Sequence, residues 1–264
     1  MYRKCFALFS VFLLVYQLFF WSIPKPVHAE ELEKRYLIGL KDGSTSIPKA
    51  IQNKAGQRML NEVVPANDLE VESEQIAPSI LVAELSAAEV QQIQSDPNVE
   101  YIEEDPLISI AENSAPDMVA NSTGAEPSSQ VVPWGIRDIG VETALGQQLT
   151  GQGVRIAVLD TGISAHPDLQ IAGGISTVEG ITSYQDDNGH GTAVAGVIAA
   201  QNNQIGIVGV SSGASLYAVK VLDQRGQGRY SYVIQGIEWA IQNHIHLISL
   251  SLGGSVDRTA LGRK

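Results

Sequence analysis

Cysteine is almost absent from this sequence. Its 264 residues include one cysteine, Cys5, so neither an internal disulfide nor a cysteine-rich metal site can form. The five histidines show no H-E-x-x-H spacing, which excludes that zinc-protease motif. Two of them, His244 and His246, lie at a predicted helix-to-strand junction, and we interpret them as structural rather than as zinc ligands.

Positive charge is also scarce. The chain has 17 lysine and arginine residues against 29 acidic residues, a net charge of −12. This surplus of negative charge argues against nucleic acid and anionic membrane surfaces as partners. The acidity is uneven, because residues 30–112 hold 17 acidic and 6 basic residues, a net charge of −11. The N-terminal part is therefore predicted to be a separate, strongly charged unit.

The one long apolar run, residues 6–21, is shorter than the roughly 20 residues that span a bilayer. Arg3 and Lys4 precede this run, and the small residue Ala29 suits cleavage after it. An uncleaved membrane anchor is the alternative. We favour a cleaved signal peptide over residues 1–29, which predicts a secreted, extracellular protein that has no membrane attachment after cleavage.

Residues 30–111 have the pattern of a small α+β domain. Their apolar and alternating runs predict strands and helices in the order β-α-β-β-α-β, that of a ferredoxin-like sandwich. Ser86, with Glu89 three residues later, predicts a capping box at the start of the second helix. The strands are expected at residues 34–40, 68–73, 79–85 and 99–105, and the first helix at 45–60. Residues 112–129 are rich in serine, asparagine, proline and alanine, and are predicted to be a linker that a protease can cut.

Residues 130–264 show a different pattern. Short apolar strands at 153–160, 215–222 and 246–254 alternate with helical segments such as 230–244, which predicts a parallel sheet covered on both faces. In such sheets, ligand sites gather at the carboxyl ends of the strands. Asp160 lies at one such end.

The D-T-G segment that begins at Asp160 occurs in two unrelated classes of protease. Aspartic proteases are all-β and need two such loops, whereas this sequence has one, inside an α/β pattern. Subtilisin-like serine proteases end their first core strand on a similar segment. Residues 186–200, DDNGHGTAVAGVIAA, place His190 before a helix of small residues that can pack close to the sheet. A carboxylate beside an imidazole is the base half of a nucleophilic triad.

Seven segments extend this similarity along the chain. In order, VPWG, VLDTGI, HPDL, GHGTAVAG, GVSSGASLYAVKVL, GIEWAI and SLGG resemble those of bacterial subtilisin-type secreted endopeptidase precursors. The resemblance implies an N-terminal ferredoxin-like α+β propeptide domain and then the first half of a parallel-sheet subtilisin-like α/β domain. It implies that Asp160 is the triad acid and His190 the triad base. The sequence departs at Ala193, where the family has a second histidine that is not a triad member.

The resemblance also implies how a peptide would bind. Two backbone segments would clamp an extended peptide by β-pairing, and Tyr230 would form the wall of a pocket for a substrate side chain. The two segments are Gly226, Gln227 and Gly228, and Ser251, Leu252 and Gly253.

A structural calcium ion, Ca2+, is implied as well. All its ligands would be oxygen atoms, as a hard cation requires. Gln130, Asp168 and Asn203 would bind through side chains, and Gln201, Ile205 and Ile207 through their carbonyl oxygens. A polar surface loop without a metal is the alternative.

The family's nucleophilic serine, in a G-T-S segment, and its oxyanion asparagine both follow S-L-G-G, and neither occurs before Lys264. Ser211 in GVSSG fits G-x-S-x-G, but that motif needs a strand before it and a helix after it, so we reject Ser211. We therefore expect this chain by itself to be inactive.

Two hypotheses follow. The first is a monomeric endopeptidase precursor that acts on peptides or proteins and is inhibited by its own propeptide. The second is a non-enzymatic inhibitor or chaperone of the propeptide type that carries an inert half-domain.

Overall fold

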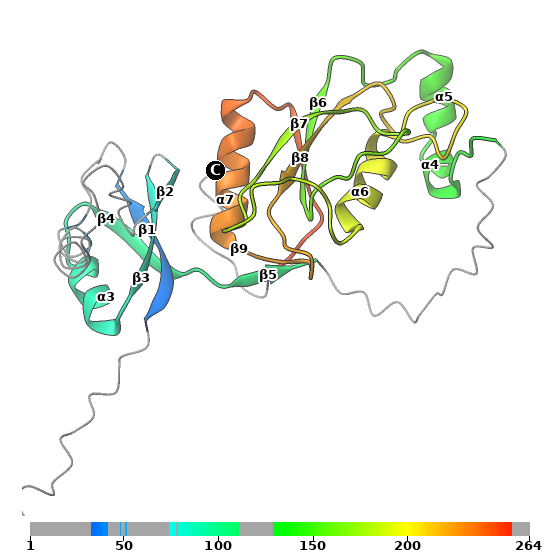
Figure 1. Ribbon diagram of the computed structural model, residues 1–264. Coiled ribbons are helices and arrows are strands. Elements are labelled where there is room, and N and C mark those ends of the chain that lie inside the picture. Colours follow the sequence, from blue (N-terminus) through cyan, green and yellow to red (C-terminus); the bar gives the residue numbers. More distant parts are fainter. Residues whose placement is uncertain are drawn as a thin grey trace, which may run out of the picture. The chain divides into compact units, whose positions relative to one another are not determined.

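The described part of the chain contains two four-stranded sheets, one two-stranded sheet and several helices (Figure 1). The computed structural model describes residues 33–41, 48, 51, 79–110 and 129–254, and the backbone of residues 74–77. Lys34–Lys264 forms one compact unit. Four predicted features lie outside the described residues, wholly or almost so: the signal peptide at 1–29, the helix at 45–60, the strand at 68–73 and the linker at 112–129.

The first sheet is antiparallel and has the strand order β2-β3-β1-β4. Its strands are β1 (Lys34–Leu40), β2 (Glu74–Ala77), β3 (Ile80–Leu85) and β4 (Val99–Glu104). This is the strand order of the predicted ferredoxin-like sandwich. Its helix α3 (Ala87–Gln94) begins with the predicted capping box, in which the Glu89 carboxylate accepts a hydrogen bond from the Ser86 N–H at 2.7 Å.

The second sheet is parallel and has the order β10-β6-β8-β7. Its strands are β6 (Arg155–Asp160), β7 (Ile171–Ser176), β8 (Ser215–Lys220) and β10 (Leu247–Leu250). Two short helices, α4 (Trp134–Asp138) and α5 (Val141–Gly146), precede β6. The longer helices are α6 (His190–Ala199) and α7 (Tyr230–Gln242). None of the helices in the described part of the chain is long and apolar enough to cross a membrane.

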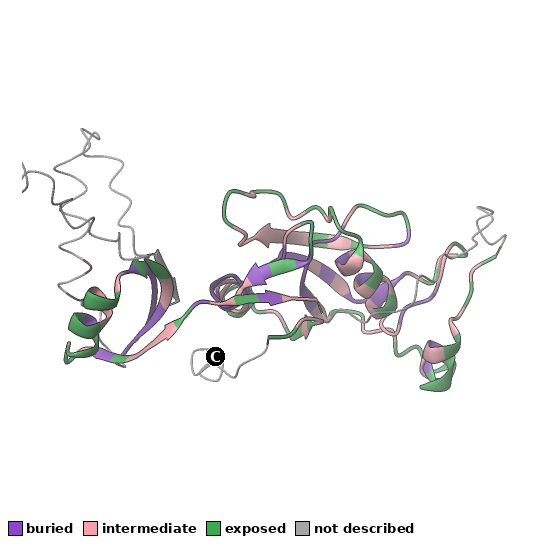
Figure 2. Cartoon of the chain, turned by 90° about the horizontal axis from the view of Figure 1, so that it is seen from below, coloured by how far each residue is buried: buried purple, intermediate pink, exposed green. Residues whose placement is uncertain are grey.

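Side chains of the central strands β6 and β8 alternate between two apolar layers, as strand geometry requires. Ala157, Leu159 and Val219 pack in the layer that contains the buried residues of α7. Val158 and Ala218 pack in the other layer, with the buried alanines of α6. Buried residues are concentrated along these strands (Figure 2). The predicted parallel α/β arrangement, buried on both faces, is therefore confirmed.

A two-stranded antiparallel sheet joins the N-terminal part to the α/β part. It consists of β5 (Leu107–Ser109) and β9 (Gln227–Arg229). Just before β5, the buried Asp105 carboxylate accepts hydrogen bonds from the Ser231 N–H at 2.9 Å and the Ser231 hydroxyl at 2.7 Å. Ser231 lies in the first turn of α7, so Asp105 satisfies a helix N–H that has no partner within the helix. Arg35 on β1 balances the charge of Asp105 at 3.1 Å.

We predict that Asp105→Asn destabilises the chain by about 1–3 kcal/mol, because it weakens the cap of α7 and removes one of the two carboxylates that contact the partly buried Arg35. Urea unfolding of the full chain measures this difference. Asp138→Asn, at an exposed aspartate in α4, is the matched control and should change stability by less than about 0.5 kcal/mol. Equal effects of the two substitutions would contradict the prediction.

Candidate functional site

Asp160 and His190 meet at the carboxyl end of β6. Their side chains are joined by a contact of 2.8 Å between His190 Nδ1 and Asp160 Oδ1. The Asp160 side chain is fully buried, whereas the His190 side chain is 33% exposed. Thr161 N–H donates a second hydrogen bond to Asp160 Oδ1 at 2.7 Å. One end of the pair is thus fixed in the protein interior, and the imidazole reaches solvent.

Close packing of α6 against the end of β6 makes this contact possible. A Cβ atom at Gly191 would collide with the carbonyl oxygen of Gly162 and come within 3.2 Å of Asp160 Oδ1. Gly189, which precedes His190, has a φ of 104°, a conformation that favours glycine. The glycines on both sides of His190 therefore allow the helix to begin directly over Asp160.

Asp186 fastens the loop before His190 to the end of β6. One of its carboxylate oxygens accepts hydrogen bonds from the Thr161 hydroxyl at 2.8 Å and the Gly189 N–H at 2.9 Å. The other accepts from the Thr192 N–H at 2.9 Å. Burial alone would raise the pKa of Asp186, but hydrogen bonds from Gly189, Thr192 and Asn188 outweigh it and lower the pKa to about 2. Asp186 is therefore ionised at neutral pH and holds both loops.

The residues predicted to bind a peptide surround a segment of the chain itself. In the antiparallel pair of β5 and β9, Ser109 lies opposite Gln227 and Ile108 opposite Gly228. The Ile110 N–H donates to the Gly226 carbonyl at 3.0 Å. On the other side, Ser109 and Gly253 exchange two backbone hydrogen bonds of 3.0 and 3.2 Å. Residues 107–110 are thus held between the two predicted backbone segments.

One side chain of this segment is buried in an apolar cluster. Ile108 is 3% exposed and belongs to the same cluster as Leu222, Tyr230 and Val233, against which Leu252 packs. Leu107, its neighbour, is 60% exposed. The predicted role of Tyr230 as a pocket wall stays a prediction, and the structure places Ile108 and Tyr230 in one buried cluster.

The residues predicted to bind calcium converge at the other end of α6. The Gln130 Nε2 atom donates to carbonyl oxygens of Gln201 at 2.6 Å, Ile205 at 2.9 Å and Ile207 at 3.1 Å. It also lies 3.3 Å from Asn203 Oδ1. Four protein oxygens thus point at one place, where the Gln130 amide supplies partial positive charge.

Asp168 adds a buried negative charge to this group. Its Oδ2 atom accepts a hydrogen bond from the Ile207 N–H at 3.1 Å. Its Oδ1 atom is buried and has no hydrogen-bond partner among the described residues. A buried oxygen of this kind needs a donor or a cation. The described residues contain no cluster of three or more histidine, cysteine or acidic ligands, so a metal here would depend mainly on carbonyl and amide oxygens.

Sequence reasoning missed three charged residues that the structure places around the Asp160–His190 pair and β9. Asp186 joins the loops that carry Asp160 and His190, Asp105 caps α7, and the fully buried Lys220 ends β8. Lys220 carried a signal, since a charged residue inside the apolar run SLYAVKVL must have a buried partner. The role of Asp105 depends on a contact with a residue 126 positions away and had no local signal.

We predict that the stability lost in Asp186→Asn depends on pH. A carboxylate whose pKa is lowered from 3.8 to about 2 stabilises the fold above pH 3.8 and loses this effect as the pH falls through 2. The substitution should cost about 1–2 kcal/mol at pH 6, after allowance for screening of this partly exposed group, and much less near pH 2. Urea unfolding of both proteins at the two pH values measures the change. A difference that is the same at both values would contradict the lowered pKa.

Comparison with known proteins agrees with this geometry. Residues 151–263 match the family model described as "Subtilase family". The chain is 41% identical over 236 residues to a thermostable alkaline protease of Halalkalibacterium halodurans, an alignment that covers 89% of this chain and 57% of that protein. It is 43% identical over 231 residues to M-protease of Shouchella clausii, covering 85% and 55%. It is 40% identical over 231 residues to subtilisin E of Bacillus subtilis, covering 87% and 54%.

The chain therefore spans about half the length of the curated relatives that it matches. Its parallel sheet, with helices on both faces, is a subtilisin-like α/β fold. Residues 151–263 therefore match the subtilase family, and the similarity to these proteases extends over 85–89% of the chain.

Proposed function

We propose that this chain is the precursor part of a secreted serine endopeptidase, in which Asp160 and His190 form the base half of the catalytic triad. The observation that carries the proposal is the 2.8 Å contact between the buried Asp160 carboxylate and Nδ1 of the partly exposed His190. A carboxylate at Nδ1 fixes the tautomer that leaves Nε2 able to take a proton from a serine hydroxyl. It also stabilises the imidazolium that results.

No serine hydroxyl within the described residues forms a hydrogen bond with His190. Ser211 lies in a turn that leads into β8, with no helix after it, which supports its rejection as a nucleophile. The nucleophile and the oxyanion donor must therefore come from outside the described residues. The substrates would be peptides and proteins that bind in extended form along β9 and Gly253.

We also infer that residues 30–111 are the propeptide and act as an intramolecular inhibitor. Residues 107–110 form backbone hydrogen bonds along β9 and with Gly253, and Ile108 is buried in the apolar cluster that contains Tyr230. An extended peptide held in this way occupies the place of a substrate. The same contacts favour the second candidate, a non-enzymatic propeptide-type inhibitor, since they need no nucleophile.

Secretion and processing complete the proposal. The apolar run at residues 6–21 and the small residue Ala29 support a cleaved signal peptide at residues 1–29. Residues 112–129 would be the segment that is cut to release a mature enzyme, which we propose to be a secreted monomer.

The triad roles are tested by hydrolysis of casein. The protein to be tested contains this chain together with a serine nucleophile and an oxyanion donor. In it we expect His190→Asn to lower kcat about 10⁶-fold and Asp160→Asn about 10⁴-fold, by analogy with such removals in subtilisin and trypsin. His244→Asn, at an exposed histidine, is the matched control and should have wild-type activity.

The chain of 264 residues by itself should not cleave casein. Two results would overturn the assignment: full activity of His190→Asn in the completed protein, or cleavage by this chain that His190→Asn abolishes. The second result would mean that one of its own serines is the nucleophile.

We further propose that the group around Gln130 and Asp168 holds a structural calcium ion. The unpaired buried Asp168 Oδ1 and the converging oxygens support this, because calcium binds six to eight oxygen ligands. The Asn203 side chain and the carbonyl oxygens of Gln201, Ile205 and Ile207 would supply further ligands. Gln130 points its Nε2 atom at these oxygens, whereas its Oε1 atom accepts a hydrogen bond from the Gln204 N–H, so its amide would have to turn to bind the ion through oxygen. The ion would stabilise the loop after α6 and would take no part in peptide hydrolysis.

Calcium should therefore raise the thermal midpoint of the chain. At about a hundredfold excess over the dissociation constant, binding contributes about 2.7 kcal/mol, or about 5–10 °C in a chain of this size. Asp168→Asn removes the negative charge of the site and should abolish the response, whereas Asp138→Asn should leave it intact. An Asp168→Asn protein that still responds to calcium and to a chelator as the wild type does would show that the site is elsewhere or absent.

A further inference from the structure

Lys220 is a buried ammonium group that the proposed mechanism does not use. It is the last residue of β8, directly opposite Asp160 in the parallel pair of β6 and β8. Its side chain has no exposed surface. A lysine in such a place needs partners for its charge and its three donors, since burial of an unpaired charge is strongly unfavourable.

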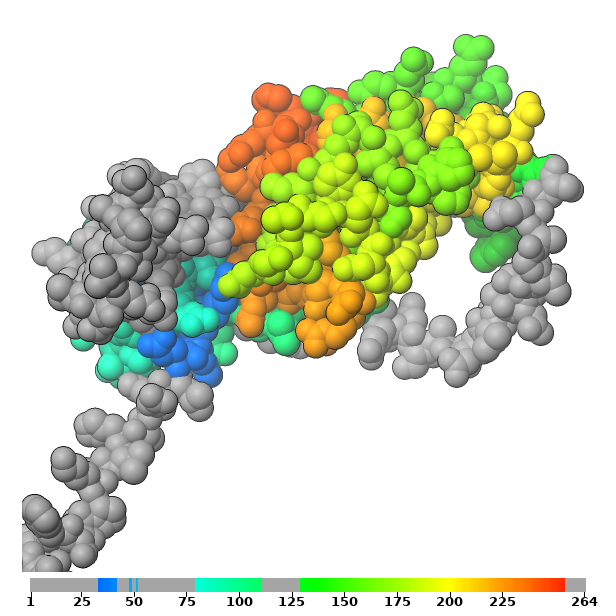
Figure 3. Space-filling view, viewed as in Figure 1, coloured from blue at the N-terminus to red at the C-terminus, as the bar shows by residue number. Residues whose placement is uncertain are grey.

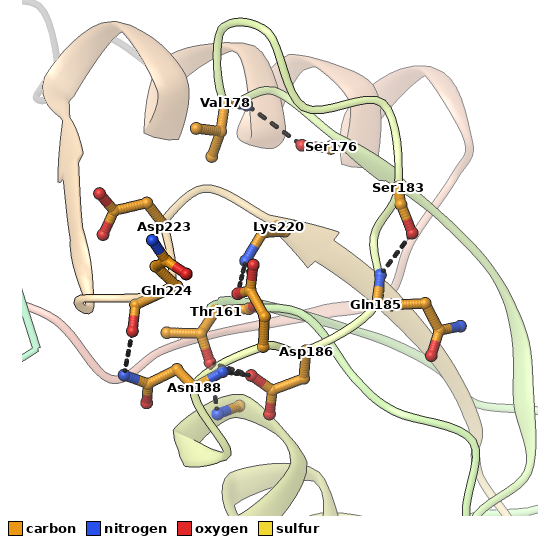
Figure 4. A network of polar contacts seen from close by, with 12 residues as sticks. Thr161, Ser176, Val178, Ser183, Gln185, Asp186, Asn188, Lys220, Asp223 and Gln224 are labelled. Carbon is orange, nitrogen blue, oxygen red and sulfur yellow. Dashed lines mark hydrogen bonds and ion pairs between the residues drawn. The ribbon is translucent and has the colours of Figure 1, made fainter.

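The partners of Lys220 come from the two loops that carry the acid–base pair. Its Nζ atom donates to the Thr161 carbonyl oxygen at 2.6 Å and to Asp187 Oδ1 at 2.7 Å. Thr161 directly follows Asp160, and Asp187 lies three residues before His190. Figure 4 shows Lys220 beside Thr161 and the loop of Asp186.

We propose that Lys220 is a positioning residue for the Asp160–His190 pair, whose buried ammonium ties the strand end that carries Asp160 to the loop that leads into His190. The inference rests on the proposed function of that pair. Lys220 touches neither member and acts through the backbone of Thr161 and the side chain of Asp187.

The arrangement of charges explains why a cation is suited to this position. Three carboxylates lie near the carboxyl end of β6 and the start of α6, namely those of Asp160, Asp186 and Asp187. The Lys220 ammonium contacts the Asp187 carboxylate of this group. Asp186 already binds Thr161 through its hydroxyl, so Lys220 adds a second link through the Thr161 carbonyl. The two links hold Thr161 through its side chain and through its carbonyl group, and would restrict movement of the neighbouring Asp160.

The loop of residues 186–190 has a further attachment that fixes its outer side. The Asn188 side chain donates to the Gln224 carbonyl at 3.0 Å. On the face shown in Figure 3, yellow-green atoms lie against orange atoms, so these two parts of the chain are neighbours in space. Lys220 is the inner attachment of the same loop. Without it, the loop would keep only its attachments through Asp186, Asn188 and His190 among the described residues.

Nuclear magnetic resonance of the full chain with ¹⁵N-labelled histidine tests the proposal. The readout is the His190 Nδ1 proton: its presence reports the hydrogen bond to Asp160, and its exchange with solvent reports how tightly the pair is held. We expect Lys220→Met, which keeps the apolar stem and removes the charge, to accelerate this exchange by about tenfold or more. Lys41→Met, at an exposed lysine bound to the Pro97 carbonyl, is the matched control and should leave it unchanged.

Asp187 provides a second pair of variants at a partly exposed position. Asp187→Ala removes the acceptor and should accelerate exchange, whereas Asp187→Asn keeps an oxygen for Lys220 and should largely restore the wild-type rate. This pair decides the question if Lys220→Met does not fold. A protected Nδ1 proton that is unaffected by Lys220→Met and Asp187→Ala would overturn the role of Lys220 while the acid–base pair stands. No protected Nδ1 proton in the wild-type chain would overturn both.

Discussion

Burial of the Asp160 carboxylate at the carboxyl end of β6 determines how the neighbouring loops and α6 must be arranged. Asp160 is a fully buried carboxylate, and such a group needs donors nearby. The Thr161 N–H and His190 Nδ1 both contact its Oδ1 atom, which requires α6 to begin directly over the strand end. Its Oδ2 atom is buried and has no hydrogen-bond partner among the described residues. The absence of a side chain at Gly191 and the hydrogen bonds of Asp186 allow this close approach, and Lys220 would support it in the role proposed above.

Helix α6 connects the two candidate sites of the α/β part. Its first residue is His190, and the loop that follows its last residue, Ala199, supplies the oxygens around Gln130. With 10 residues the helix is about 15 Å long, so the two sites are separate but share one rigid element. A cation at the far end would stabilise the element that positions the imidazole, which gives the proposed calcium ion a structural role in catalysis without contact with the substrate.

Apolar runs were enough to predict β6, β8 and α7, because each is a local pattern that burial on both faces explains. The capping box at Ser86 and the pair of Asp160 and His190 were also predictable from short motifs. Residues 226–228 were predicted to pair with an extended peptide from the family resemblance alone. The short strands β5 and β9 carry too little periodicity to be predicted from local pattern, and they pair across about 120 positions. The partners of Asp105 and Lys220 could not be predicted for the same reason, although a lysine within a buried strand indicates that some partner exists. His246, interpreted as structural, accepts a hydrogen bond from the Arg155 N–H at 2.9 Å.

We propose that residues 107–110 occupy the place of a substrate peptide, with Ile108 as the anchor. The most direct test is inhibition of a mature subtilisin-like protease by residues 30–111, produced separately and shown to be folded by circular dichroism. We expect the segment to inhibit, and Leu107→Asp to preserve the inhibition, since Leu107 is 60% exposed. Ile108→Asp should weaken it at least about 100-fold, because it places a charge in an apolar cluster. Equal inhibition by the two variants, or no inhibition by the folded wild-type segment, would contradict this proposal.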